Sequence, residues 1–119
     1  MQPFTLGGET ACYEAGAAPV RQDTVYDLAS LTKPLATLPA VLNLFGQQRL
    51  TLDARVASAM AAWQGDDRAD VTIAHLLEHA GGLPARFAGP PPQGDDAFAH
   101  EICAVPLAYT PGTRALYTD

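Results

Sequence analysis

The sequence predicts an α+β chain that is mostly helical, with a short β segment near its N-terminus. Apolar residues recur every three or four positions after residue 30, which is typical of a helix with one buried face. A second helical pattern covers residues 70–82, and two runs near the N-terminus, 9–14 and 23–28, favour extended structure. With 119 residues, of which 48% are hydrophobic, the chain has room for a modest globular core.

The first helix is expected to begin at Ser30 and to run to about residue 45. Its apolar stripe consists of Leu31, Leu35, Leu38, Val41, Leu42 and Phe45. Pro34 falls in the first turn, where backbone N–H groups have no partner within the helix in any case. Pro39 lies inside the pattern and removes one helical hydrogen bond, so we expect it to bend the helix.

Shorter elements are predicted after this helix. An Ala-rich stretch, residues 56–63, indicates a short helix. In the helix over residues 70–82, Thr72 is a good N-cap, and Val71 and Leu76 have the spacing of a hydrophobic staple across it. The residues expected to form its buried face are Ile73, Leu76, Leu77 and Ala80. Gly81 and Gly82 are expected to supply the left-handed residue that ends it.

Consecutive prolines predict a surface loop over residues 84–96, because proline excludes both a helix and an interior strand there. A last helix is expected over residues 96–105 and ends before Pro106. Cys12 and Cys103 could form a disulfide, but two buried reduced thiols are the more ordinary interpretation.

Charge and composition exclude several classes of protein. The net charge is −6, and the seven Lys and Arg residues are scattered, so nucleic acid is not an expected partner. No apolar run approaches the roughly 20 residues that span a bilayer. The first residues also lack the basic and apolar regions of a secretory signal. The compartment stays open, and the cytoplasm is favoured only because no signal is visible.

Ser30 and Lys33 form an S-x-x-K pattern at the start of the first predicted helix. Residues three apart share a helix face, so the two side chains can exchange a proton. Serine becomes a nucleophile when a base takes its proton, and a lysine can serve once its pKa falls from about 10.4 toward neutrality. The helix N-terminus would also stabilise an oxyanion formed beside the serine. Taken alone, the tetrapeptide is more often an N-cap serine beside an exposed lysine.

The surrounding residues make the pattern specific. The run TVYDLASLTKPLAT resembles the nucleophile segment of the penicillin-binding-protein and class C β-lactamase-like serine hydrolases. The runs RLTLDARV, VTIAHLLEHAGGLP and YTPGTRALYTD resemble later segments of that superfamily and occur in the same order. The superfamily includes β-lactamases, D,D-peptidases, D-aminopeptidases and esterases. The resemblance covers about residues 16–119 apart from the proline loop.

The resemblance implies a β-lactamase/transpeptidase-like fold and a serine acyl-transfer mechanism without a cofactor. Ser30 would be the acylated nucleophile, Lys33 its proton partner and Tyr117 a further member of the acid–base network. Asp119 would stand where the superfamily has the Asn or Asp that orients the substrate. Small esters, β-lactams or peptides are the implied substrates. An Asp in place of Asn favours ester or D-amino-acid peptide chemistry over β-lactam hydrolysis, because a carboxylate cannot donate a hydrogen bond.

The resemblance also predicts that residues 1–119 are a single incomplete domain. The superfamily's third motif, Lys-Thr-Gly or His-x-Gly, is missing, together with the C-terminal strands. Tyr117 would then lie near a free end, so we expect little or no activity from the chain alone. Half a sheet leaves an open edge and an uncovered apolar face, which favours self-association or binding of a complementary C-terminal fragment.

Two alternatives stay open. A non-catalytic member of the same fold would hold peptidoglycan-like or acyl ligands without turnover. The segment HLLEH also fits the inverted zinc-protease pattern, with His75 and His79 as ligands and Glu78 as base. That pattern needs a third ligand from farther downstream, and the flanking residues match the serine-hydrolase helix. We therefore predict that His75 packs in the first turn, that His79 lies at the helix C-terminus, and that neither holds a metal.

Overall fold

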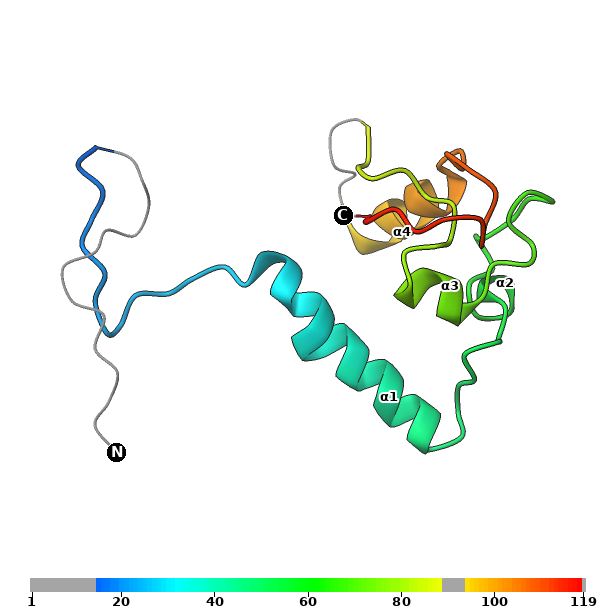
Figure 1. The fold of residues 1–119 in the computed structure, drawn as a ribbon, viewed down its shortest axis with the longest axis horizontal. Helices are drawn as coiled ribbons and strands as arrows, with labels where there is room; N and C mark the ends of the chain where they lie inside the picture. Colours follow the sequence, from blue (N-terminus) through cyan, green and yellow to red (C-terminus); the bar gives the residue numbers. More distant parts are fainter. Residues whose placement is uncertain (1–14, 89–93, 119) are drawn as a thin grey trace.

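The computed structural model describes residues 15–88 and 94–118. The predictions for residues 9–14, for Cys12 and for Asp119 lie outside these ranges. In Figure 1 a long helix separates two parts of the chain, an N-terminal arm that extends to one side and a body of short helices and loops on the other. The molecule is accordingly elongated, with principal extents of 54 × 37 × 29 Å.

The helix predicted from Ser30 is present, and its geometry changes along its length. It begins as a 3-10 turn, η1 (Ala29–Leu31), continues as a π-helical turn, η2 (Lys33–Thr37), and becomes regular in α1 (Leu38–Gly46). Pro39 accounts for the π-helical turn, because it has no N–H for the Leu35 carbonyl and its ring would clash with that carbonyl in α geometry. In the wider turn the Leu38 N–H donates to the Lys33 carbonyl. The effect of Pro39 therefore falls on the turn before it.

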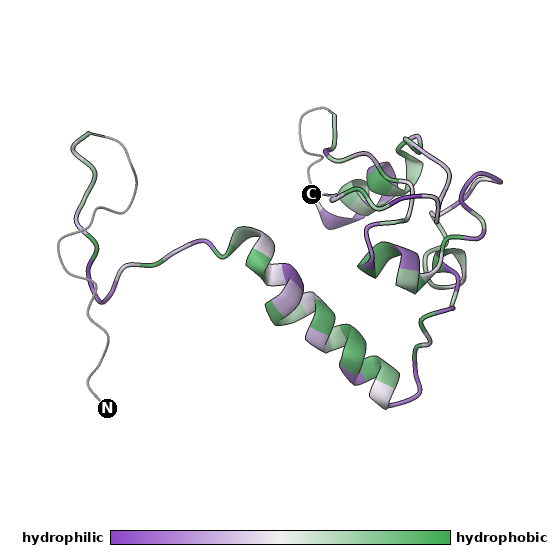
Figure 2. Ribbon diagram, in the orientation of Figure 1, coloured by the Kyte–Doolittle hydropathy of each residue, from purple (hydrophilic) through white to green (hydrophobic). Residues whose placement is uncertain are grey.

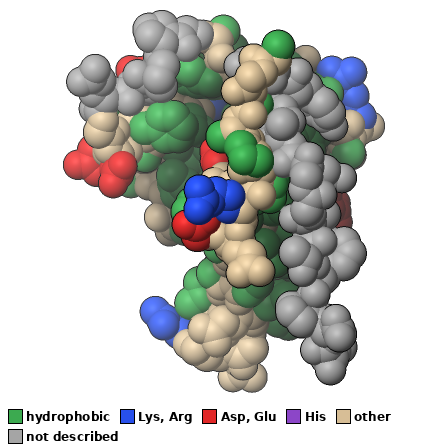
Figure 3. Space-filling view, turned by 90° about the vertical axis from the view of Figure 1, so that its left-hand side faces the viewer, with side chains coloured by type: hydrophobic (Ala, Val, Ile, Leu, Met, Phe, Trp, Pro, Cys, Tyr) green, Lys and Arg blue, Asp and Glu red, His purple; other side chains and the backbone are tan. Residues whose placement is uncertain are grey.

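The apolar face of this helix is exposed among the described residues, which corrects the expectation that it is buried. Leu31, Leu35 and Leu42 are 57%, 62% and 56% exposed. Figure 2 shows apolar residues along most of the helix, and Figure 3 shows hydrophobic side chains at the surface when the molecule is seen from the arm side. Periodicity correctly predicted a helix with an apolar face. Periodicity does not show whether another segment packs against that face.

The core lies in the second half of the chain, between α2 (Val56–Ala59), α3 (Ile73–Leu77) and α4 (Asp95–Ala104). Its buried members are Val56, Trp63, Val71 and Cys103, and Ile73, Leu76 and Leu83 pack against them. Cys103 is a buried free thiol. Helix α2 is shorter than predicted because Met60 takes an extended conformation and ends it. Helix α4 matches its prediction to within a residue at each end.

The start of α3 confirms the predicted cap. Thr72 Oγ1 accepts the His75 N–H at 3.3 Å, and His75 Nδ1 accepts the Thr72 N–H at 3.3 Å. This is a capping box in which histidine replaces the usual Glu or Gln. Val71 and Leu76 join the same apolar cluster, as a hydrophobic staple requires. The prediction that His75 packs in the first turn is thus confirmed.

The end of α3 differs from the prediction. The helix stops at Leu77, and His79, with a φ of 55°, takes the left-handed conformation that had been assigned to Gly81 or Gly82. Leu77 was predicted to be buried and is 36% exposed, whereas Ala80 is buried as expected. The early stop turns the chain so that residues after His79 run away from the helix axis.

Extended structure is scarce in the described part of the chain. Residues 23–28, predicted to be extended, form no strand, because no described residue pairs with them in a ladder. An isolated antiparallel bridge joins Arg55 to Thr72. Nor do residues 15–88 and 94–118 contain a helix both long and apolar enough to cross a membrane.

Arg68 is a charged residue inside the core, 5% exposed. Its guanidinium donates to the carbonyl of Cys103 and, at 2.8 Å, to that of Val105, both at the end of α4. It also lies over the Trp63 ring, and Trp63 Nε1 donates to the Arg68 carbonyl at 3.0 Å. Asp67, 3.2 Å away, provides a countercharge, and the hydrogen bond from Arg68 lowers the pKa of that carboxyl. Arg68 thereby ties α4 to the loop before α3.

Replacing Arg68 by methionine is expected to lower the free energy of unfolding by roughly 2–3 kcal/mol, because two carbonyls lose a charged donor in a buried site. Urea denaturation followed by circular dichroism measures the change. Arg86→Met, at an exposed arginine, is the matched control and should stay within about 0.5 kcal/mol of wild type. Equal losses in the two variants would contradict the proposed tie.

Candidate active site

Ser30, Lys33 and Tyr117 form one hydrogen-bonded cluster, although Tyr117 is 87 residues from Ser30 in the sequence. The Tyr117 hydroxyl donates to Ser30 Oγ at 2.6 Å. Lys33 Nζ donates to Tyr117 Oη at 3.1 Å and to Ser30 Oγ at 3.5 Å. The same ammonium lies 5.0 Å from the centroid of the Tyr117 ring. The structure thus brings together the three residues that the sequence marked for catalysis.

Local helix geometry positions Ser30 and Lys33. Ser30 lies in η1 and Lys33 opens η2, and residues three apart are nearly eclipsed in a tight turn. Ala29, just before the serine, has a φ of 44°, which is uncommon for a residue with a Cβ. Its N–H donates to Asp27 Oδ1 at 2.8 Å, which holds the chain where it enters the helix. Strained backbone of this kind is concentrated at functional sites.

Tyr117 is positioned by a different part of the chain. Residues 79–82, called the platform below, accept hydrogen bonds from the returning segment 108–118, drawn at the red end of the colour scale in Figure 1. The carbonyls of Gly82, Ala80 and His79 each accept a backbone N–H at 2.8 Å, and the donors are Ala108, Gly112 and Leu116 respectively. These hydrogen bonds hold the segment 108–118 on the platform and so place Tyr117 near the start of the first helix.

The His79 side chain adds two contacts that the sequence pattern did not reveal. Its Nδ1 accepts the Thr118 N–H at 3.2 Å, and its ring centroid is 4.7 Å from that of Tyr117. The sequence predicted only that His79 lies at the helix end, where it indeed lies. Its pairing with Tyr117 is a long-range contact, and no local pattern encodes such a contact.

The cluster is open to solvent. Ser30 is exposed, Lys33 is partly buried, and Tyr117 is 50% exposed. A cavity of about 440 Å³ opens beside it. Lys33, His79 and Thr118 contribute to its wall, and the rest is mainly apolar, including Pro34, Leu38, Leu76, Leu77 and Leu83. The cluster and the cavity beside it are therefore both accessible from solvent.

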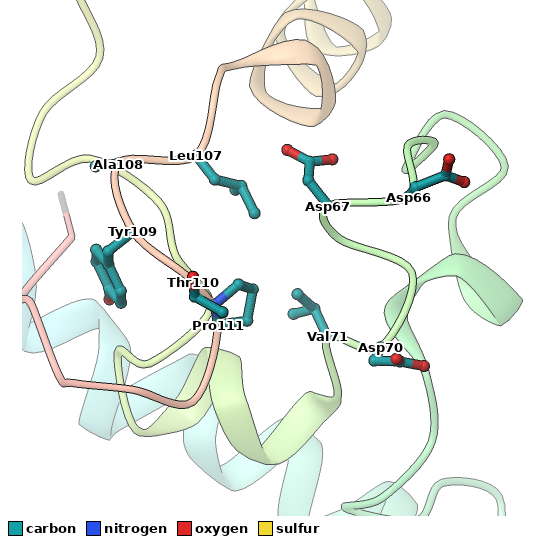
Figure 4. Close-up of a pocket in the computed structure, with 9 residues that line it drawn as sticks. All are labelled: Asp66, Asp67, Asp70, Val71, Leu107, Ala108, Tyr109, Thr110 and Pro111. Atoms are coloured by element: carbon teal, nitrogen blue, oxygen red, sulfur yellow. The ribbon is translucent and has the colours of Figure 1, made fainter.

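A second cavity, of about 640 Å³, lies elsewhere in the body (Figure 4). It is bordered by the loop that carries Asp66, Asp67 and Asp70, and by residues 107–111. Neither Ser30, Lys33 nor Tyr117 lines this cavity. Its carboxylates are therefore not part of the Ser30 cluster.

The zinc-protease interpretation gains no support from the side-chain positions. Because α3 ends at Leu77, His79 is not on a common helix face with His75. The Nδ1 atoms of both histidines accept backbone N–H groups. Within the described ranges, no group of three or more His, Cys, Asp or Glu side chains is placed to hold a metal ion.

Comparison with known proteins identifies the family. A model of the family described as Beta-lactamase matches residues 4–119. The chain belongs to the Beta-lactamase family. This confirms the resemblance inferred from four sequence segments. No solved structure matches the chain significantly.

The curated proteins similar to this chain have different named activities. The chain is 43% identical over 74 residues to the esterase EstB of Burkholderia gladioli. This match covers 59% of this chain and 18% of that esterase. It is 33% identical over 110 residues to a putative D-alanyl-D-alanine carboxypeptidase of Escherichia coli K12, covering 81% and 25%. It is 28% identical over 118 residues to an N-acetylmuramyl-L-alanine amidase of Bacillus subtilis 168, covering 86% and 26%. The chain thus spans about a quarter or less of each of these proteins.

Gly82 provides a test of the platform. It has a φ of 87°, and a Cβ there would lie 2.7 Å from the Tyr109 carbonyl oxygen. Gly82→Ala is expected to lower the free energy of unfolding by roughly 2–4 kcal/mol, from left-handed strain and displacement of residues 108–118. Urea denaturation measures this loss.

Gly16→Ala is the control for backbone strain alone. Gly16 has a φ of 84°, and a Cβ there would meet nothing within 4 Å. We expect it to lower the free energy of unfolding by no more than about 1–2 kcal/mol. If Gly82→Ala were no more destabilising than this control, close packing on the platform would be contradicted.

Proposed function

We propose that this chain carries the nucleophile and the acid–base residues of a serine hydrolase that acts through an acyl-Ser30 intermediate. The observation that carries the proposal is the 2.6 Å hydrogen bond between Tyr117 and Ser30, with Lys33 in reach of both oxygens. A serine, a lysine and a tyrosine in mutual contact can pass a proton among themselves. This is the requirement for activating a hydroxyl nucleophile.

In the proposed acylation step, Ser30 Oγ attacks the carbonyl carbon of the substrate. Tyr117 donates its proton to Ser30 Oγ in the structure, so in the proposed step it first releases that proton to solvent. The Lys33 ammonium, 3.1 Å from the phenolic oxygen, would stabilise the resulting phenolate, which then accepts the Ser30 proton. A bond forms between Oγ and the acyl carbon, the bond to the leaving group breaks, and Tyr117 gives the proton to the leaving group. Tyr117 is the acid and base in this scheme, and Lys33 provides electrostatic support.

Hydrolysis of the acyl-Ser30 ester completes the cycle. A water molecule loses a proton to the Tyr117 phenolate and adds to the acyl carbon. The bond to Oγ then breaks, and the proton returns to Ser30. The products are a free carboxylic acid and an unmodified serine, so no cofactor is consumed.

We propose small esters or D-amino-acid peptides as substrates. The names of the relatives, an esterase, a putative D-alanyl-D-alanine carboxypeptidase and an amidase, all describe cleavage of acyl compounds. Asp119, which lies outside the described residues, is proposed to orient the substrate, because it follows Tyr117 as the superfamily's Asn or Asp does. The Asp119 carboxylate would bind a cationic or hydroxyl group of a substrate better than it would bind a carboxylate of a substrate.

Covalent labelling tests this function. Turnover by the chain alone is expected to be little or none, but covalent capture requires only an activated Ser30. We expect a fluorophosphonate probe to add one group to the wild-type chain, detected by intact mass, and to add none to Ser30→Ala. Tyr117→Phe and Lys33→Met should slow labelling by about 100-fold, because the first removes the acid–base group and the second removes the charge that supports it. Tyr26→Phe, at an exposed tyrosine in the arm, is the control and should label at the wild-type rate.

The choice of reagent separates the substrate classes. A fluorescent penicillin that also labels Ser30 would extend the substrates to β-lactams. Stable acylation by an ester without release of acid would instead indicate a non-catalytic, ligand-holding protein. Labelling that persists in Ser30→Ala would contradict the proposed nucleophile.

We further propose that the active form includes additional polypeptide that covers the apolar face of the first helix. The support is the exposure of Leu31, Leu35 and Leu42 and the fact that the chain matches only 18%, 25% and 26% of the length of the three relatives. Polypeptide equivalent to the remaining part of those relatives would bury this face. By itself, a face of this kind drives association.

The isolated chain is therefore expected to self-associate and to bind a hydrophobic dye. Replacing both Leu35 and Leu42 by asparagine should reduce association in sedimentation velocity and also reduce dye binding. Asn43→Ser, a change at an exposed polar position of the same helix, should leave both unchanged. A monodisperse wild-type monomer that binds no dye would contradict the proposal.

A further inference from the structure

We propose that His79 is a positioning residue for the Ser30 reaction, holding Tyr117 against Ser30 and Lys33. The inference rests on the proposed function of that cluster and adds a residue to it. His79 touches neither Ser30 nor Lys33 through a hydrogen bond in the structure, so its effect would pass through Tyr117.

His79 contacts the chain before, at and after Tyr117. Its carbonyl accepts the Leu116 N–H at 2.8 Å, and its Nδ1 accepts the Thr118 N–H at 3.2 Å. Between these bonds, its ring packs on the Tyr117 ring at 4.7 Å with an interplanar angle of 40°. Holding the residues on both sides of Tyr117 restricts the backbone, and the ring contact restricts the side chain.

The backbone of His79 is itself held for this role. Its φ of 55° lies in the left-handed region, which histidine visits more often than most residues but at some strain. The Tyr109 hydroxyl donates to the His79 carbonyl at 2.8 Å and so fixes the peptide in this orientation. A residue needed only to end α3 could be glycine or asparagine. Histidine there adds an aromatic ring and a nitrogen acceptor, and both are used on the Tyr117 segment.

Accurate placement of Tyr117 matters because its hydroxyl is the link between Ser30 and Lys33. Tyr117 is 50% exposed, so contacts to its backbone and to one face of its ring matter for where the phenol lies. A displacement of about 1 Å at a catalytic group can slow a reaction by about 100-fold. Loss of the His79 side chain is therefore expected to weaken the 2.6 Å Tyr117–Ser30 contact.

Three variants separate the contributions of His79. His79→Gly keeps the left-handed backbone and removes both the ring and the acceptor. His79→Asn also tolerates that backbone, and its Oδ1 can replace Nδ1 as acceptor for the Thr118 N–H. His79→Phe keeps a ring against Tyr117 and loses the acceptor. His100→Gln, at an exposed histidine on α4, is the control.

Two measurements test each variant of the 119-residue chain: the rate of fluorophosphonate labelling, and hydrogen exchange of the amides at residues 116–118. We expect His79→Gly to label about 10- to 100-fold more slowly and to exchange faster at Thr118. His79→Asn should recover protection at Thr118 and part of the labelling rate, while His79→Phe recovers labelling without that protection. The control should match wild type in both measurements.

The outcomes separate this inference from the proposed function. If wild type labels and His79→Gly labels at the same rate, His79 is not a positioning residue. If His79→Gly loses protection throughout the body, including Val71, and His79→Asn does not restore labelling, its role is structural and the inference fails. If wild type does not label at all, the proposal that this chain by itself holds an activated Ser30 fails. Exchange then decides whether His79 holds the Tyr117 segment, and equal exchange in wild type and His79→Gly would overturn that.

Discussion

The candidate site depends on the docking of residues 108–118 onto the platform at residues 79–82. Three backbone hydrogen bonds, each 2.8 Å, join these segments, and the Tyr109 hydroxyl adds a fourth bond to the His79 carbonyl. Gly82 allows the close approach, because any Cβ there would meet the Tyr109 carbonyl oxygen. Without this docking, Tyr117 would have no fixed position relative to the first helix. The early end of α3 is what leaves the platform free to accept these bonds.

The two halves of the site are held by forces of different kinds. Ser30 and Lys33 are neighbours because one short stretch of helix places them so. Tyr117 reaches them only through contacts that span most of the sequence, and these depend on the core around Val71 and on Arg68 holding α4 in place. None of the residues that form η1, η2 and α1 is buried. Its side of the site therefore has less support than the Tyr117 side, in keeping with the proposal that additional polypeptide covers this face.

Membership of the Beta-lactamase family narrows the chemistry more than it narrows the substrate. Relatives matched over the same region are named as an esterase, a putative carboxypeptidase and an amidase. A serine activated by a lysine and a tyrosine suits all of these reactions, because each begins with attack on a carbonyl carbon. Under the proposed function, residues around the cluster would select the substrate, among them the mainly apolar residues that line the cavity beside Lys33.

The sequence by itself determined the features that are local. The helix after Ser30, the Thr72 cap, the helix before Pro106 and the Ser30–Lys33 spacing all follow from periodicity and capping within a few residues. The role of Tyr117 as a partner was implied only by the resemblance of four ordered segments to the superfamily. Only the tertiary structure decided that α3 ends at Leu77, that the apolar stripe of the first helix is exposed, and that His79 packs on Tyr117. These features depend on long-range packing and hydrogen bonds between segments distant in sequence, and such contacts leave no period or spacing in the residues that make them.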